Sequence, residues 1–158
     1  MLNTELIKAV DNARILGLFK TFCENNANAE AQRRIRNILA KSKDDKNTVK
    51  EIIKREQKVI LSDFESERML VLVNAFLKKK SFRTSIKKEL KERLLIIQNY
   101  KCAICNCDID ISSHADHIVP FKYVGDYLED NWQLLCKHCN EAKNDSLDYQ
   151  IKYLLKLL

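Results

Sequence analysis

The chain has 158 residues, of which 46% are hydrophobic, and this is enough to form the core of one domain or of two small ones. Its 2 glycines and 1 proline exclude turn-rich β-sandwiches and favour long helices, so we predict a mainly α fold. No segment approaches the roughly 18 apolar residues that span a membrane. Glu5, Lys8 and Arg14 interrupt the N-terminus where a signal peptide would lie. We expect a cytoplasmic protein, in which clustered cysteines usually bind metal.

The net charge of +6 is unevenly distributed along the chain. Lys and Arg outnumber Asp and Glu in residues 1–100, whereas acidic residues are in excess in residues 101–158. A basic half beside an acidic half suggests that one half binds a polyanion while the other holds cations. On charge alone, a solvated lysine-rich helical surface explains the same pattern equally well.

Residues 1–99 are predicted to form a basic helical domain, and local patterns place its first helices. Apolar residues at helical spacing indicate a first helix that ends near Asn25 and a second helix over residues 29–40. A capping-box pattern at Thr48–Glu51 predicts the start of a third helix, because the hydroxyl and the glutamate three residues later satisfy each other's backbone donors.

Two further helices are predicted before residue 100. Ser62–Glu65 repeats the capping-box pattern and opens a helix that reaches about Lys79. A long helix follows over residues 83–99. Residues 1–75 contain no motif that indicates a role, so binding to DNA, formation of a homodimer and docking of a partner protein all stay open for these helices.

The character of the chain changes at Tyr100. From this residue onward come all but one of the cysteines, all three histidines, and the only proline and tryptophan. We therefore predict a second domain, residues 100–158. Its expected elements are a short hairpin within residues 108–120, a turn at Val124–Asp126, an extended segment at residues 131–135, the start of a helix at residues 139–144 and a closing amphipathic helix at residues 146–158.

Two C-x-x-C pairs are the strongest local signal in the second domain. Each pair directs two thiolates at one point, and two pairs complete a tetrahedral zinc site of the structural type. The gap of 30 residues between the pairs has room for a folded insertion. The alternative is two redox-active or merely buried cysteine pairs. The predicted zinc ligands are Cys102, Cys105, Cys136 and Cys139, which leave Cys23 and Cys107 outside the frame.

The insertion and the second cysteine pair carry the groups that phosphodiester hydrolysis needs. Asp116 supplies a hard oxygen ligand and Asn140 a carbonyl oxygen, a sparse shell that leaves positions for water and substrate oxygens, as magnesium prefers. A histidine side chain ordinarily titrates near physiological pH, so His117 fits the role of general base. Each of these residues alone is a weak signal, and the inference rests on the set.

The order of these landmarks over residues 100–145, C-x-x-C, D-H-I-V-P and N-W-Q-L-L-C-x-x-C-N-x-x-K, resembles the HNH endonuclease family with its ββα-metal fold. The resemblance implies a nuclease that hydrolyses DNA phosphodiester bonds with a divalent ion, Mg²⁺ or Mn²⁺, beside a structural Zn²⁺. It implies that His117 is the general base and that Asp116 and Asn140 bind the catalytic ion. It also implies that Asn131 braces the loop that carries the base, and that Lys143 lies near the phosphate. In prokaryotes such nucleases often serve defence systems or mobile elements.

The sequence departs from the family pattern at two places. Asn140 is an asparagine rather than a histidine, a variant that the family tolerates, and the usual glycine pair in the loop is reduced to Gly125. Neither departure removes a catalytic group. His114 lies close to His117 in the sequence and is either a strand residue or a phosphate contact.

A basic segment before the first cysteine pair is predicted to contact DNA. Interleaved apolar residues would face a core and leave one cationic face. Phosphate contacts from Lys and Arg supply most of the non-specific affinity for DNA. A solubilising surface is the alternative. The predicted DNA-binding residues are Lys78, Lys79, Lys80, Arg83, Lys87, Lys88 and Lys91.

Two other functions compete with a DNA endonuclease. A non-catalytic zinc module that binds nucleic acid or a partner protein has no need of Asp116, His117 and Asn140 together, so this trio argues against it. An RNase with the same chemistry needs the same trio and is not excluded by the sequence. No sequence pattern indicates which DNA sequence would be cut, or whether the cut would be a nick or a double-strand break.

Overall fold

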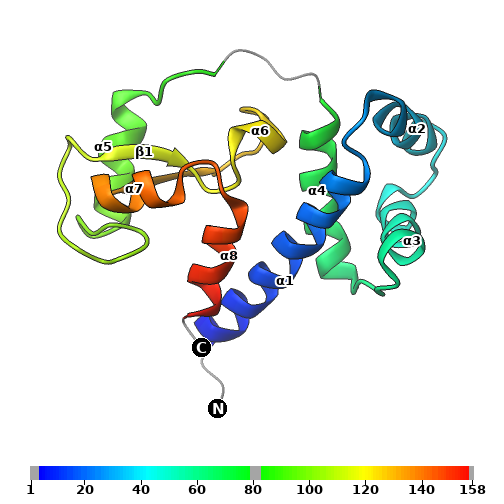
Figure 1. Ribbon diagram of the computed structural model, residues 1–158, viewed down its shortest axis with the longest axis horizontal. Coiled ribbons are helices and arrows are strands. Elements are labelled where there is room, and N and C mark those ends of the chain that lie inside the picture. Colours follow the sequence, from blue (N-terminus) through cyan, green and yellow to red (C-terminus); the bar gives the residue numbers. More distant parts are fainter. Residues whose placement is uncertain (1–3, 79–82, 157–158) are drawn as a thin grey trace. The chain divides into compact units, whose positions relative to one another are not determined.

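The computed structural model describes the backbone of residues 4–78 and 83–156, and the side chains of residues 10–78 and 83–156. The chain forms two compact units, a first unit of residues 1–79 with 154–158 and a second unit of residues 80–153. The described residues form eight helices and one two-stranded sheet, so the predicted mainly α fold with a small C-terminal ββα module is confirmed (Figure 1). Within these ranges no helix has the length and apolar character that crossing a bilayer requires.

The first unit is a helical bundle with an aromatic centre. Phe76 meets Phe19 and Phe22 edge-on, at centroid distances of 6.3 and 5.8 Å, and all three side chains are buried. Such edge-to-face pairs add to the free energy gained by burying apolar surface. The helices are α1 (Thr4–Asn25), α2 (Ala29–Ala40), α3 (Asp45–Gln57) and α4 (Asp63–Leu77), with α1, α3 and α4 packed against one another.

One of the two predicted capping boxes is present, and the other is wrong. Ser62 accepts from the backbone of Glu65, whose carboxylate accepts from the Ser62 backbone, so α4 begins as predicted. Helix α3 instead begins at Asp45, because Asp44 caps it by accepting from the backbone N–H of Asn47. Thr48 then lies inside the first turn, where its hydroxyl donates to the Asp44 carbonyl at 3.0 Å.

The second unit is built around a short antiparallel sheet. Strand β1 pairs with β2, and Ala115 lies opposite Leu134. The predicted hairpin within residues 108–120 is wrong, because the partner of β1 comes from residues 132–135 and the earlier residues form only an isolated bridge between Lys101 and Asp108. The elements are α5 (Lys88–Ile97), β1 (His114–His117), α6 (Phe121–Val124), β2 (Trp132–Leu135), α7 (Lys137–Lys143) and α8 (Leu147–Leu155).

Helix α5 is shorter than the predicted helix over residues 83–99. Residues 83–87 are not helical, because the backbone N–H of Thr84 donates to the carboxylate of Asp126 instead of entering a helical turn. At the other end, the Gln98 side chain donates to the Leu134 carbonyl and accepts from the Leu134 N–H, both at 2.9 Å. Gln98 thus attaches α5 to β2.

Candidate functional site

The sheet and α7 bring the predicted catalytic residues together. Asp116 and His117 end β1, where they lie opposite Gln133 and Trp132 of β2. Helix α7 follows β2 directly and contacts both strands, and it carries the two predicted site residues Asn140 and Lys143.

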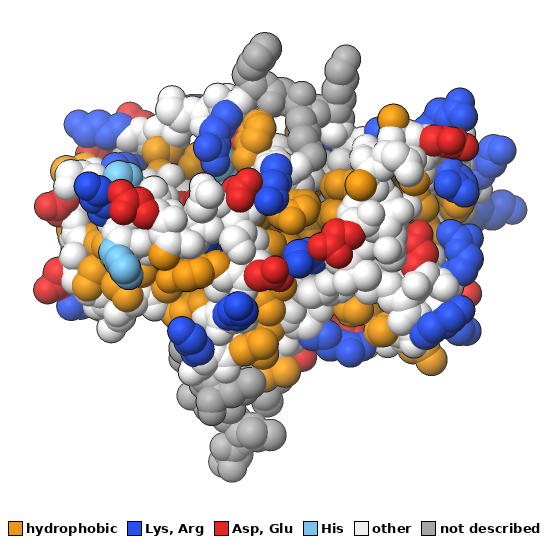
Figure 2. Space-filling view, in the orientation of Figure 1, with side chains coloured by type: hydrophobic (Ala, Val, Ile, Leu, Met, Phe, Trp, Pro, Cys, Tyr) orange, Lys and Arg blue, Asp and Glu red, His pale blue; other side chains and the backbone are white. Residues whose placement is uncertain are grey.

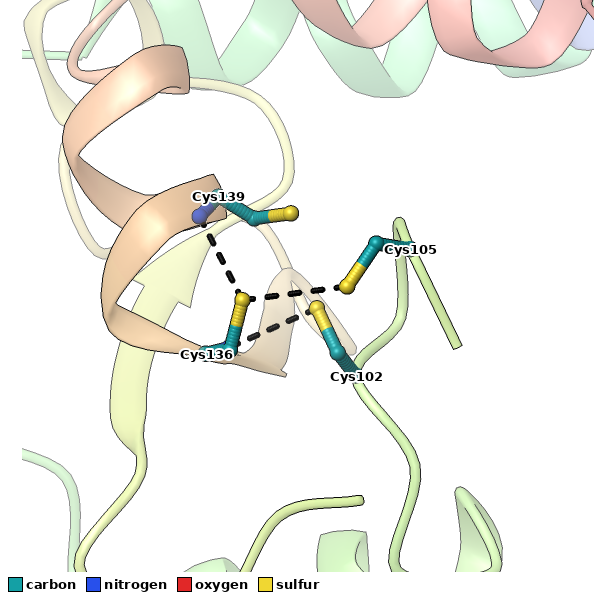
Figure 3. Close-up of side chains that lie close together, drawn as sticks. All are labelled: Cys102, Cys105, Cys136 and Cys139. Carbon is teal, nitrogen blue, oxygen red and sulfur yellow. Dashed lines mark hydrogen bonds between the residues drawn. The ribbon is translucent and has the colours of Figure 1, made fainter. Parts of the chain in front are cut away.

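The four predicted zinc ligands form one cluster. The Sγ atoms of Cys102, Cys105, Cys136 and Cys139 all lie within 4.8 Å of one another. Figure 3 shows the four side chains directed at a common point, with Cys136 and Cys139 at the start of α7. The backbone N–H of Cys136 also donates to the sulfur of Cys102, at 3.4 Å. Among the described residues this is the one group of three or more His, Cys, Asp or Glu side chains that could share a metal ion.

The geometry of the cluster fits zinc. A tetrahedral site with Zn–S bonds of about 2.3 Å has sulfurs about 3.8 Å apart, and the Sγ atoms of Cys105 and Cys136 are 3.7 Å apart. Burial raises the pKa of the Cys139 thiol above its usual range, and hydrogen bonds with the neighbouring sulfurs raise it further. A bound cation reverses this effect because it stabilises the thiolates. The four cysteines could therefore hold a zinc ion.

Asp116 lies in a buried polar network rather than in open solvent. Its Oδ2 accepts from Lys143 Nζ at 2.8 Å and from Gln133 Nε2 at 3.1 Å. Lys143 is only 1% exposed and also donates to the carbonyl of His117, at 2.9 Å. Gln133 in turn donates to Gln150 of α8, at 3.1 Å. The buried ammonium of Lys143 therefore compensates the negative charge of Asp116.

His117 is held on several sides. Its Nε2 lies 2.8 Å from Oδ1 of Asp126, and its ring lies against that of Trp132 with centroids 4.0 Å apart. The side chain is 3% exposed, and its buried Nδ1 atom has no hydrogen-bond partner among the described residues. A buried polar atom without a partner carries a free-energy cost, so Nδ1 is suited to bind water or substrate.

Asn131 connects the two strands through the segment that follows His117. Its Oδ1 accepts from the N–H of Val119 and its Nδ2 donates to the Val119 carbonyl, both at 2.8 Å. The Asn131 carbonyl accepts from the N–H of Ile118. Three hydrogen bonds thus hold the two residues after His117, which is the geometry that a bracing residue requires.

A pocket of about 410 Å³ joins these groups. Asp116, His117 and Asn140 line it together with Trp132, and Arg83 also contributes to its wall. The oxygens of a carboxylate and an amide are ligands that suit a hard divalent ion, and the imidazole of His117 lines the same pocket. Lys143 is not among the residues that line this pocket, and its place near the phosphate stays a prediction.

The structure describes five of the seven predicted DNA-binding residues. Lys79 and Lys80 lie outside the described residues. Arg83 is exposed, with its guanidinium 5.6 Å from the ring centroid of Phe121. The others are Lys78 after α4, exposed Lys87 and Lys88 at the start of α5, and half-buried Lys91. Lys and Arg side chains also gather over α2 and α3 of the first unit (Figure 2).

Sequence reasoning missed three residues of the site. Thr84 was placed in a helix and Asp126 in a turn, although Asp126 contacts both His117 and Thr84. Gln133 is an ordinary strand residue in the sequence, yet it contacts Asp116. A carboxylate after the single glycine of the loop was the one available signal for Asp126, and it is a weak one.

Comparison with known families places the site in context. Residues 102–146 match the family model described as HNH endonuclease. This range begins at the first zinc-ligand candidate and includes β1, β2, α7 and all the residues that line the pocket from Ala115 onward. Comparisons with curated proteins and with solved structures gave no match.

Proposed function

We propose that residues 102–146, an HNH endonuclease module, give the chain the activity of a metal-dependent nuclease that hydrolyses phosphodiester bonds of DNA. The supporting observation is the shared pocket, which Asp116 and His117 of β1 and Asn140 of α7 line together. A zinc-binding module that only holds a partner would not need these three groups on one wall.

Asp116 and Asn140 are the residues that would hold a divalent ion, Mg²⁺ or Mn²⁺. Such an ion, when bound, offsets the negative charge that develops on the phosphate and the leaving oxygen. Asp116 keeps Oδ1 available for this role, because the hydrogen-bond partners of its carboxylate among the described residues, Lys143 and Gln133, both contact Oδ2. Asn140 has no competing side-chain hydrogen bond among the described residues and lines the same pocket.

His117 acts as the general base in this proposal. Its Nδ1 accepts a proton from a water molecule, and the resulting hydroxide attacks the phosphorus atom. The bridging ester oxygen then leaves and takes up a proton from the solvent. Asn131 holds the residues after His117 in place. Lys143 is a positioning residue, since its ammonium fixes the Asp116 carboxylate and the His117 carbonyl.

Plasmid cleavage tests the proposal. The full chain is incubated with supercoiled DNA and Mg²⁺ or Mn²⁺, with a chelator control and a parallel single-stranded RNA substrate. We expect cleavage of DNA that His117→Ala lowers by about 10²- to 10⁴-fold, while zinc content and DNA affinity stay unchanged. A matched control is His138→Ala, because His138 is exposed and does not line the pocket.

The outcomes separate the competing functions. Metal-dependent cleavage of RNA alone would replace DNA by RNA as the substrate. DNA binding without cleavage, with equal behaviour of wild type and His117→Ala, would support the non-catalytic module and reject the enzyme.

A further inference from the structure

The hydrogen bond between His117 and Asp126 is part of a longer chain of contacts. The second carboxylate oxygen of Asp126, Oδ2, accepts from both the backbone N–H and the hydroxyl of Thr84, each at 3.0 Å. One oxygen of Asp126 therefore faces the imidazole while the other is tied to a different segment of the second unit. The carboxylate cannot rotate without breaking at least one of these bonds.

The chain conformation before Asp126 supports this arrangement. Helix α6 ends at Val124, and Gly125 follows with φ of 58° and ψ of −143°. Residues with a Cβ atom rarely adopt this backbone conformation, whereas glycine adopts it at little cost. The turn brings Asp126 back to the histidine nine positions earlier in the sequence.

Asp126 is suited to accept a hydrogen bond from the imidazole while it stays ionised. Partial burial acts to raise the pKa of Asp126, but the hydrogen bonds from His117 and Thr84 outweigh burial and lower this pKa below its usual range. An ionised carboxylate only accepts hydrogen bonds, so the shared proton belongs to Nε2 of His117. The lone pair of the neutral imidazole is then on Nδ1.

We propose that Asp126, held by Thr84, is a positioning residue that sets the tautomer and the orientation of His117 and so presents Nδ1 as the proton acceptor. This inference rests on the proposed function, in which His117 is the general base. It assigns to a side chain outside the D-H, N and C-N-x-x-K landmarks an influence on the reaction that acts through His117. The same bond explains why Nδ1 is the atom left without a partner.

A purely structural ion pair would account for the 2.8 Å contact alone. It does not account for the two additional bonds from Thr84, or for a buried nitrogen that is left without a partner in a residue that lines the pocket. Removal of a group that orients a functional histidine typically lowers activity by about 10- to 100-fold.

The first experiment does not depend on nuclease activity. Long-range ¹H–¹⁵N NMR of the full chain reports which ring nitrogen of His117 carries the proton. We expect the Nε2–H tautomer in the wild type and a mixture of tautomers in Asp126→Ala. In Asp126→Asn, the amide can donate to Nε2, so we expect a shift toward the Nδ1–H tautomer. An Asp126→Ala spectrum identical to that of the wild type would overturn the proposal.

The second experiment separates chemistry from binding. Asp126→Asn and Asp126→Ala should lower kcat by about 10- to 100-fold. KM should change little, because the side chain at position 126 does not touch the DNA in this proposal. Asp126→Glu, which restores the carboxylate, should recover part of kcat, and Thr84→Val should cause a smaller loss because the backbone N–H bond remains. Glu129→Gln, an exposed carboxylate in the same loop, is the matched control and should retain wild-type kcat.

The two experiments fail in different ways. If Asp126→Ala and Glu129→Gln have equal kcat, the positioning role is wrong even though the nuclease stands. If the wild type cleaves no nucleic acid while the tautomer still depends on Asp126, the proposed function fails and the contact determines only the state of the imidazole.

Discussion

The buried pair of Asp116 and Lys143 has consequences at the scale of single residues. The two side chains are 9% and 1% exposed, so each charge depends on the other. Lys143→Met should lower the free energy of unfolding of the second unit by about 3–5 kcal/mol, because it leaves the Asp116 carboxylate buried without its cation. Urea unfolding followed by the fluorescence of Trp132, the only tryptophan, measures this loss.

A second measurement on the same variant tests the catalytic ion site without an activity assay. A divalent ion that binds Asp116 replaces the missing positive charge, so Mg²⁺ should restore part of the stability lost in Lys143→Met. Lys137→Met is the control, because Lys137 is an exposed cation on the same helix. It should change stability by less than about 0.5 kcal/mol. Equal stability of the two variants would contradict the importance of the buried pair.

At the scale of elements, Asn131 determines how the segment between β1 and α6 is held. Asn131→Ala removes both side-chain hydrogen bonds to Val119. The variant should lose about 1–3 kcal/mol of stability, and its cleavage rate should fall because the residues after His117 are less ordered. Hydrogen exchange at the Val119 amide measures the loosening directly. Unchanged protection there, combined with lower activity, would mean that Asn131 acts by another route.

The cysteine cluster holds the two ends of the insertion, and metal binding in such sites is coupled to folding. Elemental analysis should give about one zinc per chain, and Cys139→Ser should lower zinc content together with the folded fluorescence signal of Trp132. Cys107→Ser is the control, because Cys107 is exposed and is not one of the four clustered residues. Loss of zinc in Cys107→Ser would mean that the ligand set is different.

The elements that the sequence predicted well depend on local signals. The Ser62 capping box and the two C-x-x-C pairs are defined within four residues each, and the structure places both as expected. The helix predicted from residue 83 and the hairpin predicted before Pro120 depend on which distant segment takes up the backbone hydrogen bonds. Thr84 donates to Asp126, and β1 pairs with residues 132–135. Neither of these long-range contacts leaves a periodic pattern in the sequence from which it could be predicted.

At the scale of the whole molecule, the net charge of +6 favours binding to nucleic acid, and substitutions can test which residues contact it. We expect the combined substitution of Lys79, Arg83, Lys87 and Lys88 by glutamine to weaken DNA binding and to flatten its dependence on salt, because fewer counterions are released from the phosphates. Fluorescence anisotropy at several salt concentrations measures both effects with the full chain.

A matched control keeps this test specific. Arg33, Arg34, Lys41 and Lys43 are four exposed cations of the first unit, and three of them line a shallow pocket on α2. Their replacement by glutamine changes the net charge equally. If both sets reduce affinity and salt slope to the same extent, the effect is one of overall charge and the basic segment has no special role.

The contact of Gln98 with Leu134 has a consequence for the association of whole molecules. Among the described residues, β2 pairs with a strand on one side only. On its other side the Leu134 N–H donates to the Gln98 side chain, and the Leu134 carbonyl accepts from both Gln98 and the backbone N–H of Ala103. An open strand edge is a template for pairing with another chain and hence for aggregation. Gln98→Ala should leave the Leu134 N–H at this edge without its partner, while Ala103 still donates to the carbonyl. We therefore expect concentration-dependent self-association in light scattering, and less of it in Gln98→Glu, which keeps the acceptor and whose charge repels a second copy.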